Sequence, residues 1–137
     1  EFLPAMEWKQ QYSVNIESMD EQHKKLLGLL NRLEEAMNSG KGKDVLGEIF
    51  DGLVDYTSFH FDSEEELMEK HDYGELDDHR KKHEAMTRQV LKLQKEFHEG
   101  SVGISIKTLN FLTDWLKKHI MGTDMRYGQE LNSKGIY

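Results

Sequence analysis

Histidine is the residue whose number and spacing first indicate chemistry in this 137-residue chain, which has seven histidines and no cysteine. Two pairs of potential ligands lie four residues apart, His60 with Glu64 and His79 with His83. Residues four apart lie on one face of a helix, so each pair can reach a common centre. Imidazoles and carboxylates without sulfur suit iron, zinc, manganese or copper. The spacing therefore predicts a metal site built on helices.

Three further potential ligands lie near the apolar faces of other predicted helices. His23 shares the apolar face of the first helix, and His119 shares that of the last. Asp124 follows His119 by five residues, and a regular helix would turn its side chain well away from that face. Gly122 lies between them and can loosen the last turn. We expect this loosening to bring the carboxylate back to the site.

The full candidate set combines five imidazoles with two carboxylates: His23, His60, Glu64, His79, His83, His119 and Asp124. Seven ligands are too many for one ion, which takes about four to six. Burying these groups without a metal would be very costly. The set therefore predicts two metal ions that share bridging carboxylates. His71 and His98 lie near predicted helix C-termini, where a cationic side chain is favoured, and are left out of the set.

Four helices, expected at about residues 19–38, 44–71, 76–98 and 102–122, would carry these ligands. Apolar residues recur there at three- and four-residue steps, and the single proline, Pro4, precedes all four segments. Ser18 and Glu21 fit a capping box at the start of the first helix. Short breaks between long helices imply antiparallel neighbours. The predicted fold class is all-α, an antiparallel up-down-up-down four-helix bundle over one domain, residues 1–137.

Residues 1–18 are expected to form an extended N-terminal arm that packs on the bundle. Tyr12, Val14 and Ile16 alternate with polar residues, as expected of an extended segment with one buried face. A free tail would have no need of these apolar side chains.

Composition excludes several classes of partner. The chain has 18 Lys and Arg against 26 Asp and Glu, a net charge of −8, which suits neither nucleic acid nor an anionic membrane surface. No apolar run approaches the roughly 18 residues of a membrane span, and the start lacks the pattern of a signal peptide. The absence of cysteine excludes disulfides and thiol chemistry. We therefore expect a cytoplasmic protein without nucleic-acid or membrane partners.

The ordered set of ligands resembles the hemerythrin family, specifically the bacterial hemerythrin domains. The resemblance extends over essentially the whole chain, because the family's residue types occupy all seven ligand positions in order. It rests on these features: Trp8, the stretch Ile16-Glu17-Ser18-Met19-Asp20-Glu21-Gln22-His23-Lys24, the pair His60…Glu64-Glu65, the pair His79…His83 and the pair His119…Asp124.

The resemblance implies a non-haem di-iron site that binds dioxygen reversibly and cycles between Fe2+ and Fe3+. One iron would have three histidine ligands: His79, His83 and His119. The other would have two histidine ligands: His23 and His60. Both irons would share an oxo or hydroxo bridge and two carboxylates: Glu64 and Asp124. One coordination position stays open on the iron with two histidines, and an open position is typical of binding and catalytic metals.

The resemblance also implies an apolar pocket around the bound dioxygen. Trp115 and Leu116 match the family's residues there, and Leu26 is a further candidate for the wall. A dry pocket is needed because water or protons that enter it would release peroxide and leave a diferric site that no longer binds the gas. The expected function is oxygen carriage or storage, or oxygen or redox sensing, by a protein that is not an enzyme. A signalling protein or an oxygen-consuming protein is an open choice of partner.

Two other functions compete with oxygen binding. A di-iron oxidase or iron-storage protein of ferritin-like type would use Glu-x-x-His motifs, and no glutamate in this sequence precedes a histidine by three residues. A zinc or other structural site in a helical scaffold is the second alternative. Such a site would have no open position and would not react with air.

Overall fold

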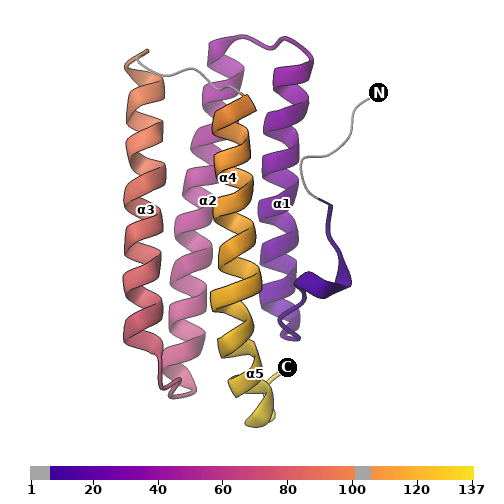
Figure 1. The fold of residues 1–137 in the computed structure, drawn as a ribbon, viewed down its shortest axis with the longest axis vertical. Helices are drawn as coiled ribbons and strands as arrows, with labels where there is room; N and C mark the ends of the chain where they lie inside the picture. Colours follow the sequence, from indigo (N-terminus) through magenta and orange to yellow (C-terminus); the bar gives the residue numbers. More distant parts are fainter. Residues whose placement is uncertain (1–6, 101–105) are drawn as a thin grey trace.

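The computed structural model describes residues 7–100 and 106–137. Over these residues the chain forms four long helices: α1 (Glu17–Asn38), α2 (Lys43–Lys70), α3 (Leu76–His98) and α4 (Ile106–Lys118). Successive helices run in opposite directions, so α1 and α3 begin at the end of the bundle where α2 and α4 finish (Figure 1). The predicted all-α four-helix bundle is confirmed. None of the helices described is both long and apolar enough to cross a membrane.

The first helix begins earlier than predicted and lacks the predicted cap. Ile16 is the N-cap residue of α1, and no side chain caps this helix end. The capping box is therefore wrong, because its serine, Ser18, already lies inside the first turn. Asp20 instead directs its carboxylate to the arm, where it accepts hydrogen bonds from the Val14 amide at 2.9 Å and from the Ser13 hydroxyl.

The last helix is longer than predicted and changes its winding. Residues 102–105 of the predicted helix fall in the part that the structure does not describe, and α4 is described from Ile106. The helix does not end at residue 122. After α4 the backbone passes through a π-helical segment, η2 (His119–Asp124), and continues as the α-helix α5 (Met125–Ser133). The predicted end of this helix is therefore wrong, whereas the loosening expected around Gly122 is observed as the wider π turn.

The N-terminal arm packs on the bundle as expected over its described part, residues 7–16. A short 3-10 turn, η1 (Gln10–Tyr12), interrupts the extended backbone. Tyr12, Val14 and Ile16 are buried, with at most 3% of each residue exposed. The arm lies beside α1 and close to the end of the bundle where the chain finishes (Figure 1). It thus closes that end of the bundle with apolar side chains.

Two apolar clusters fill the bundle, and the helices pass from one to the other. The larger cluster includes Leu26 of α1 and Phe61 of α2. The smaller cluster includes Met19 of α1 and Met68 of α2, together with side chains of the arm and of α5. Inward-facing residues between these pairs therefore lie in a layer that has apolar side chains on both sides.

Gly128 of α5 is the position where the arm comes closest to the last helix. A Cβ atom added there would lie 2.5 Å from the carbonyl oxygen of Val14. We expect Gly128→Ala to lower the free energy of unfolding by about 1–3 kcal/mol, measured by urea denaturation. Gly52→Ala is the matched control, because a Cβ at Gly52 of α2 meets nothing within 4 Å. The control should gain about 0.5–1 kcal/mol from helix propensity. Equal gains in both variants would contradict the packing of the arm on α5.

Candidate metal centre

All seven side chains of the candidate set meet in one buried cluster, and none of these residues is more than 2% exposed. The antiparallel bundle brings them together, because His23 and His79 lie near the starts of α1 and α3. His60 lies in the second half of α2, and His119 follows the last residue of α4. Because successive helices run in opposite directions (Figure 1), these positions all lie toward the same end of the bundle.

The layer of candidate metal ligands lies between the two apolar clusters of the bundle. Along α1, His23 lies between Met19 of the smaller cluster and Leu26 of the larger one. Along α2, Glu64 lies between Phe61 and Met68 in the same way. Both His23 and Glu64 are 0% exposed. Along these two helices, apolar side chains therefore cover the polar groups from both directions.

The π-helical segment places Asp124 in the cluster. A π turn spaces residues that meet on one face by five rather than four, and His119 and Asp124 are separated by five. The Nε2 atom of His119 and the Oδ1 atom of Asp124 are 2.9 Å apart. The return of this carboxylate, expected from the sequence, is therefore observed.

The cluster divides into two overlapping groups of potential ligands, each with ligand atoms within 4.8 Å of one another. One group has three histidines and two carboxylates: Glu64, His79, His83, His119 and Asp124. The other has two histidines and the same two carboxylates: His23, His60, Glu64 and Asp124. The carboxylates are therefore the shared members of an unequal pair of sites.

The oxygens of each carboxylate face both groups. Glu64 Oε1 lies 3.2 Å from His83 Nε2 and 3.3 Å from His60 Nε2, and Glu64 Oε2 lies 3.5 Å from His23 Nε2. Asp124 places Oδ1 at 3.2 Å from His79 Nε2 and Oδ2 at 2.9 Å from His23 Nε2. This is the arrangement of a carboxylate that bridges two ions.

Buried polar atoms without hydrogen bonds test whether these residues fit a metal. His23 Nε2, His60 Nε2, His79 Nε2 and both oxygens of Asp124 have no hydrogen-bond partner among the described residues. His23 Nε2 is nevertheless only 2.9 Å from Asp124 Oδ2. Metal–ligand bonds of about 2.1 Å at right angles leave neighbouring ligand atoms about 3 Å apart. The short separations without hydrogen bonds therefore fit a metal centre.

Burial and charge oppose one another in the metal-free cluster. Burial alone would lower the pKa of His23 and His119, but Asp124 and Glu64 outweigh it and raise these pKa values to about 9 and about 10. Burial likewise raises the pKa of Asp124, but His119 and His23 outweigh it and lower the pKa to about 2. The pKa of Glu64 is held well below its usual range, chiefly by His60 and His119 against the effect of burial. In the metal-free cluster His23 and His119 therefore hold a proton at neutral pH, which a metal would have to displace.

Three residues outside the candidate set hold its members in place. The hydroxyl of Tyr127 donates to Glu64 Oε2 at 2.6 Å. Gln22 Oε1 lies 2.7 Å from His60 Nδ1, and Glu65 Oε2 lies 2.8 Å from His83 Nδ1. These contacts occupy the outer nitrogens and leave each Nε2 for the centre.

None of these three residues has a role in the prediction from the sequence. Tyr127 lies beyond the predicted end of the last helix, although it follows Asp124 by three residues and shares its face when the helix continues. Gln22 and Glu65 are direct neighbours of His23 and Glu64 along the chain. Their place beside a candidate ligand in the sequence could have identified both, because a polar neighbour of one candidate ligand can face another candidate on the adjacent helix.

Sequence comparison identifies the family. The family described as Hemerythrin HHE cation binding domain matches residues 14–131. The chain belongs to the hemerythrin family. The bacteriohemerythrin of Methylococcus capsulatus is 33% identical over 132 residues, which cover 96% of this chain and 100% of that protein. The bacteriohemerythrin of Pseudomonas aeruginosa strain PAO1 is 36% identical over 121 residues, 88% of this chain and 77% of that protein.

Solved hemerythrin structures share the fold. A wild-type hemerythrin crystal structure superposes with a TM-score of 0.86 at 32% identity and covers 91% of this chain and 96% of that one. A crystal structure of a hemerythrin point mutant gives a TM-score of 0.87 at 31% identity and covers 93% of this chain and 97% of that one. The chain is thus a cation-binding hemerythrin domain with a buried His/Glu/Asp cluster.

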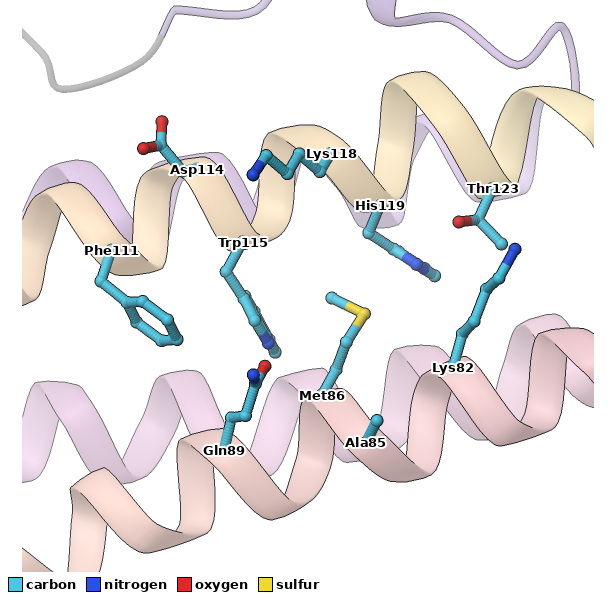
Figure 2. A pocket seen from close by; sticks show the side chains of 10 residues that line it. All are labelled: Lys82, Ala85, Met86, Gln89, Phe111, Asp114, Trp115, Lys118, His119 and Thr123. Carbon is cyan, nitrogen blue, oxygen red and sulfur yellow. The ribbon is translucent and has the colours of Figure 1, made fainter.

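The three residues expected to wall a dioxygen pocket occupy different positions in this hemerythrin fold. Leu26 and Leu116 are 0% exposed and belong to the larger apolar cluster. Trp115 is 8% exposed and lines a groove between α3 and α4 (Figure 2). Two histidines lie outside the cluster, as expected. His98 Nε2 is 2.7 Å from Asp51 Oδ1 at the surface, and His71 is the C-cap residue of α2.

Proposed function

We propose that this hemerythrin domain binds dioxygen reversibly at a di-iron centre. The observation that carries the proposal is the pair of unequal ligand groups, three histidines against two, joined by two shared carboxylates. An unequal pair leaves an open position on one metal only, and a structural metal site has none. Family membership supports iron over the other metals that this donor set suits.

The proposed ligands follow the two groups. One iron would be held by His79, His83 and His119, and the other by His23 and His60. Glu64 and Asp124 would bridge both, together with an oxo or hydroxo group. When bound, the iron pair supplies electrons that are lent to dioxygen and recovered when it leaves.

Hydrogen bonds from outside the cluster would fix how the ligands face the centre. The oxygen of Gln22 and the carboxylate of Glu65 accept hydrogen bonds, so each facing histidine donates from Nδ1 and turns an unprotonated Nε2 inward. The Tyr127 hydroxyl donates to Glu64 and holds the rotation of that carboxylate. Burial and the carboxylates raise the pKa of Tyr127 well above its usual value, so this hydroxyl keeps its proton.

The apolar surroundings would make binding reversible. Leu26 and Leu116 are fully buried in the larger cluster, and we propose them, with Trp115, as walls of the dioxygen pocket. These apolar side chains would keep water and protons away from the bound gas, which is what reversible binding requires. We therefore propose carriage, storage or sensing of dioxygen rather than enzymatic turnover.

A visible absorption spectrum through one oxygen cycle tests the proposal. The protein is loaded with Fe(II) without air, exposed to oxygen, and then stripped of oxygen under argon. We expect a charge-transfer band that appears with oxygen and disappears when it is removed, over several cycles. A one-way change to an oxidised spectrum would indicate a ferritin-like oxidase instead. No spectral change by iron-loaded protein would contradict oxygen binding.

A further inference from the structure

A groove between α3 and α4 lies against one side of the candidate metal centre. Its volume is about 460 Å³, and because one water takes up about 30 Å³ in the liquid, the groove has room for several waters. Trp115 and His119 line one wall, and Met86 of α3 lines the other (Figure 2). His119 belongs to the candidate centre, and Trp115 is a proposed wall of the dioxygen pocket. A small molecule that leaves the centre beside either residue therefore enters this groove.

The thioether of Met86 lies in the groove within one helical turn of the candidate centre. Met86 follows His83 by three residues on α3, so the two side chains share a face with their Cβ atoms about 5–6 Å apart. The Met86 side chain points across the groove toward Trp115 and His119 (Figure 2). It is half-buried and packs against the larger apolar cluster. The sulfur is thus both close to the centre and open to the groove.

Three other methionines lie near the centre in different surroundings. Met19 and Met68 are each one helical turn from a candidate ligand, but they are 4% and 0% exposed and belong to the smaller apolar cluster. Met121 follows His119 by two residues in the π-helical segment, and it is 40% exposed because it faces away from the centre. Met121 is therefore more accessible than Met86 from the solvent and less accessible from the centre.

The groove can accommodate the oxidised form of Met86. Oxidation turns the thioether into a sulfoxide, a polar group that disrupts an apolar core but not a hydrated groove. Gln89 lies three residues after Met86, and both Gln89 and Lys82 line the groove with N–H donors for the sulfoxide oxygen. Methionine sulfoxide reductases convert a sulfoxide back to the thioether. Oxidation at this position is therefore tolerated by the fold and open to repair.

We propose that Met86 is the residue that consumes hydrogen peroxide escaping from the metal centre. The inference rests on the proposed function. Dioxygen that takes two electrons from the iron pair and two protons from water leaves as hydrogen peroxide. The Met86 sulfur forms a bond to one peroxide oxygen, the O–O bond breaks, and the other oxygen leaves as water with both hydrogens. The sulfur loses two electrons and the peroxide gains them, so the candidate ligands escape oxidation.

Mass spectrometry after oxidation by dioxygen tests this site. The protein loaded with Fe(II) is kept in air with catalase until its visible spectrum shows an oxidised centre, and tandem spectra then locate each sulfoxide. Catalase destroys peroxide in solution, so only peroxide that reacts before it escapes modifies the chain. We expect at least about fivefold more sulfoxide at Met86 than at Met121. Added hydrogen peroxide on the metal-free protein should give the reverse order, because oxidation then follows exposure.

Met86→Leu is the variant that removes the sulfur while nearly conserving side-chain volume. Its peroxide release without catalase is measured with a peroxidase-coupled dye and divided by the amount of oxidised centre. If Met86 captures half of the peroxide, release should rise about twofold in this variant. Met121→Leu is the matched control and should release as much peroxide as the unchanged protein.

Two results would overturn the proposal. One is as much sulfoxide at Met121 as at Met86, or more, after oxidation by dioxygen in the presence of catalase. The other is equal peroxide release by Met86→Leu and the unchanged protein. In both cases the visible spectrum still shows that the centre reacts with dioxygen, so the proposed function stands. A spectrum that does not respond to dioxygen contradicts the proposed function instead, and this inference falls with it.

Discussion

Replacing Glu64 with glutamine is expected to remove most of the bound metal from both positions. The two oxygens of Glu64 face His83 at 3.2 Å and His23 at 3.5 Å, in different ligand groups. An amide has one acceptor oxygen and no charge, so it cannot bridge two cations. Loss of even an outer-shell partner weakens metal binding about 10–100-fold, and loss of a bridging ligand should weaken it at least as much.

The control for this variant is Glu66→Gln, which makes the same charge change at an exposed position of the same helix. Glu64→Gln should still fold, because the amide oxygen can accept the hydrogen bond from Tyr127. Metal per chain, measured by atomic emission after gel filtration, should stay high in the control and fall in Glu64→Gln. Circular dichroism checks that both variants are helical. Full metal content in Glu64→Gln would contradict the bridging role.

The convergence of the candidate ligands could be predicted from the sequence, because it depends mainly on helix geometry. The four-residue steps from His60 to Glu64 and from His79 to His83 place each pair on one face, whatever surrounds the helix. Short breaks between the helices fix their antiparallel order. Once the helices are antiparallel, residues near the starts of α1 and α3 meet residues near the ends of α2 and α4. Helix spacing and short connections, both of which can be recognised locally in the sequence, are thus enough to predict the fold and the meeting of the candidate ligands.

The continuation of the last helix did not follow from the sequence, because its cause is a tertiary contact. Gly122 lowers helix propensity, and locally it favours an end at that point. Beyond it, Tyr127 is fully buried and bonded to Glu64, and Gly128 packs against the backbone of Val14. These contacts hold residues 125–133 in a helix. Tyr127 was missed for the same reason, since its role exists only if the helix continues.

At the start of the first helix, too, a tertiary contact outweighs the local signal on which the prediction rests. Ser18 and Glu21 have the spacing of a capping box, which is a purely local signal. Asp20 bonds to the backbone of Val14 instead, and Ile16 is buried at the N-cap position. Packing of the arm therefore moves the start of the helix two residues earlier than Met19, the first residue of the predicted helix.

Removing the metal is expected to reverse how stability depends on pH. In the metal-free cluster the carboxylates raise the pKa of His23 to about 9 and that of His119 to about 10, from 6.5. Histidines whose pKa is raised by folding contribute their full stabilisation below pH 6.5, the unfolded value. This contribution is lost as the pH rises toward 10. The lowered pKa of Asp124, about 2 instead of 3.8, stabilises the fold above pH 3.8 and is lost below it. The metal-free protein should therefore be most stable between about pH 4 and 6.5.

The metal-loaded protein should show the opposite trend over the same range, because its ligands are unprotonated and acid competes with the metal. An ordinary histidine would compete only near pH 6.5, whereas the raised pKa values of His23 and His119 extend the competition above neutrality. Differential scanning calorimetry at about pH 6 and about pH 9 measures both trends. We expect the metal-free Tm to fall between these values while the loaded Tm does not. Metal addition at about pH 7.5 should also release protons, seen as a heat that depends on the buffer. A metal-free Tm that rises over this interval would show that the two carboxylates do not hold protons on the facing histidines.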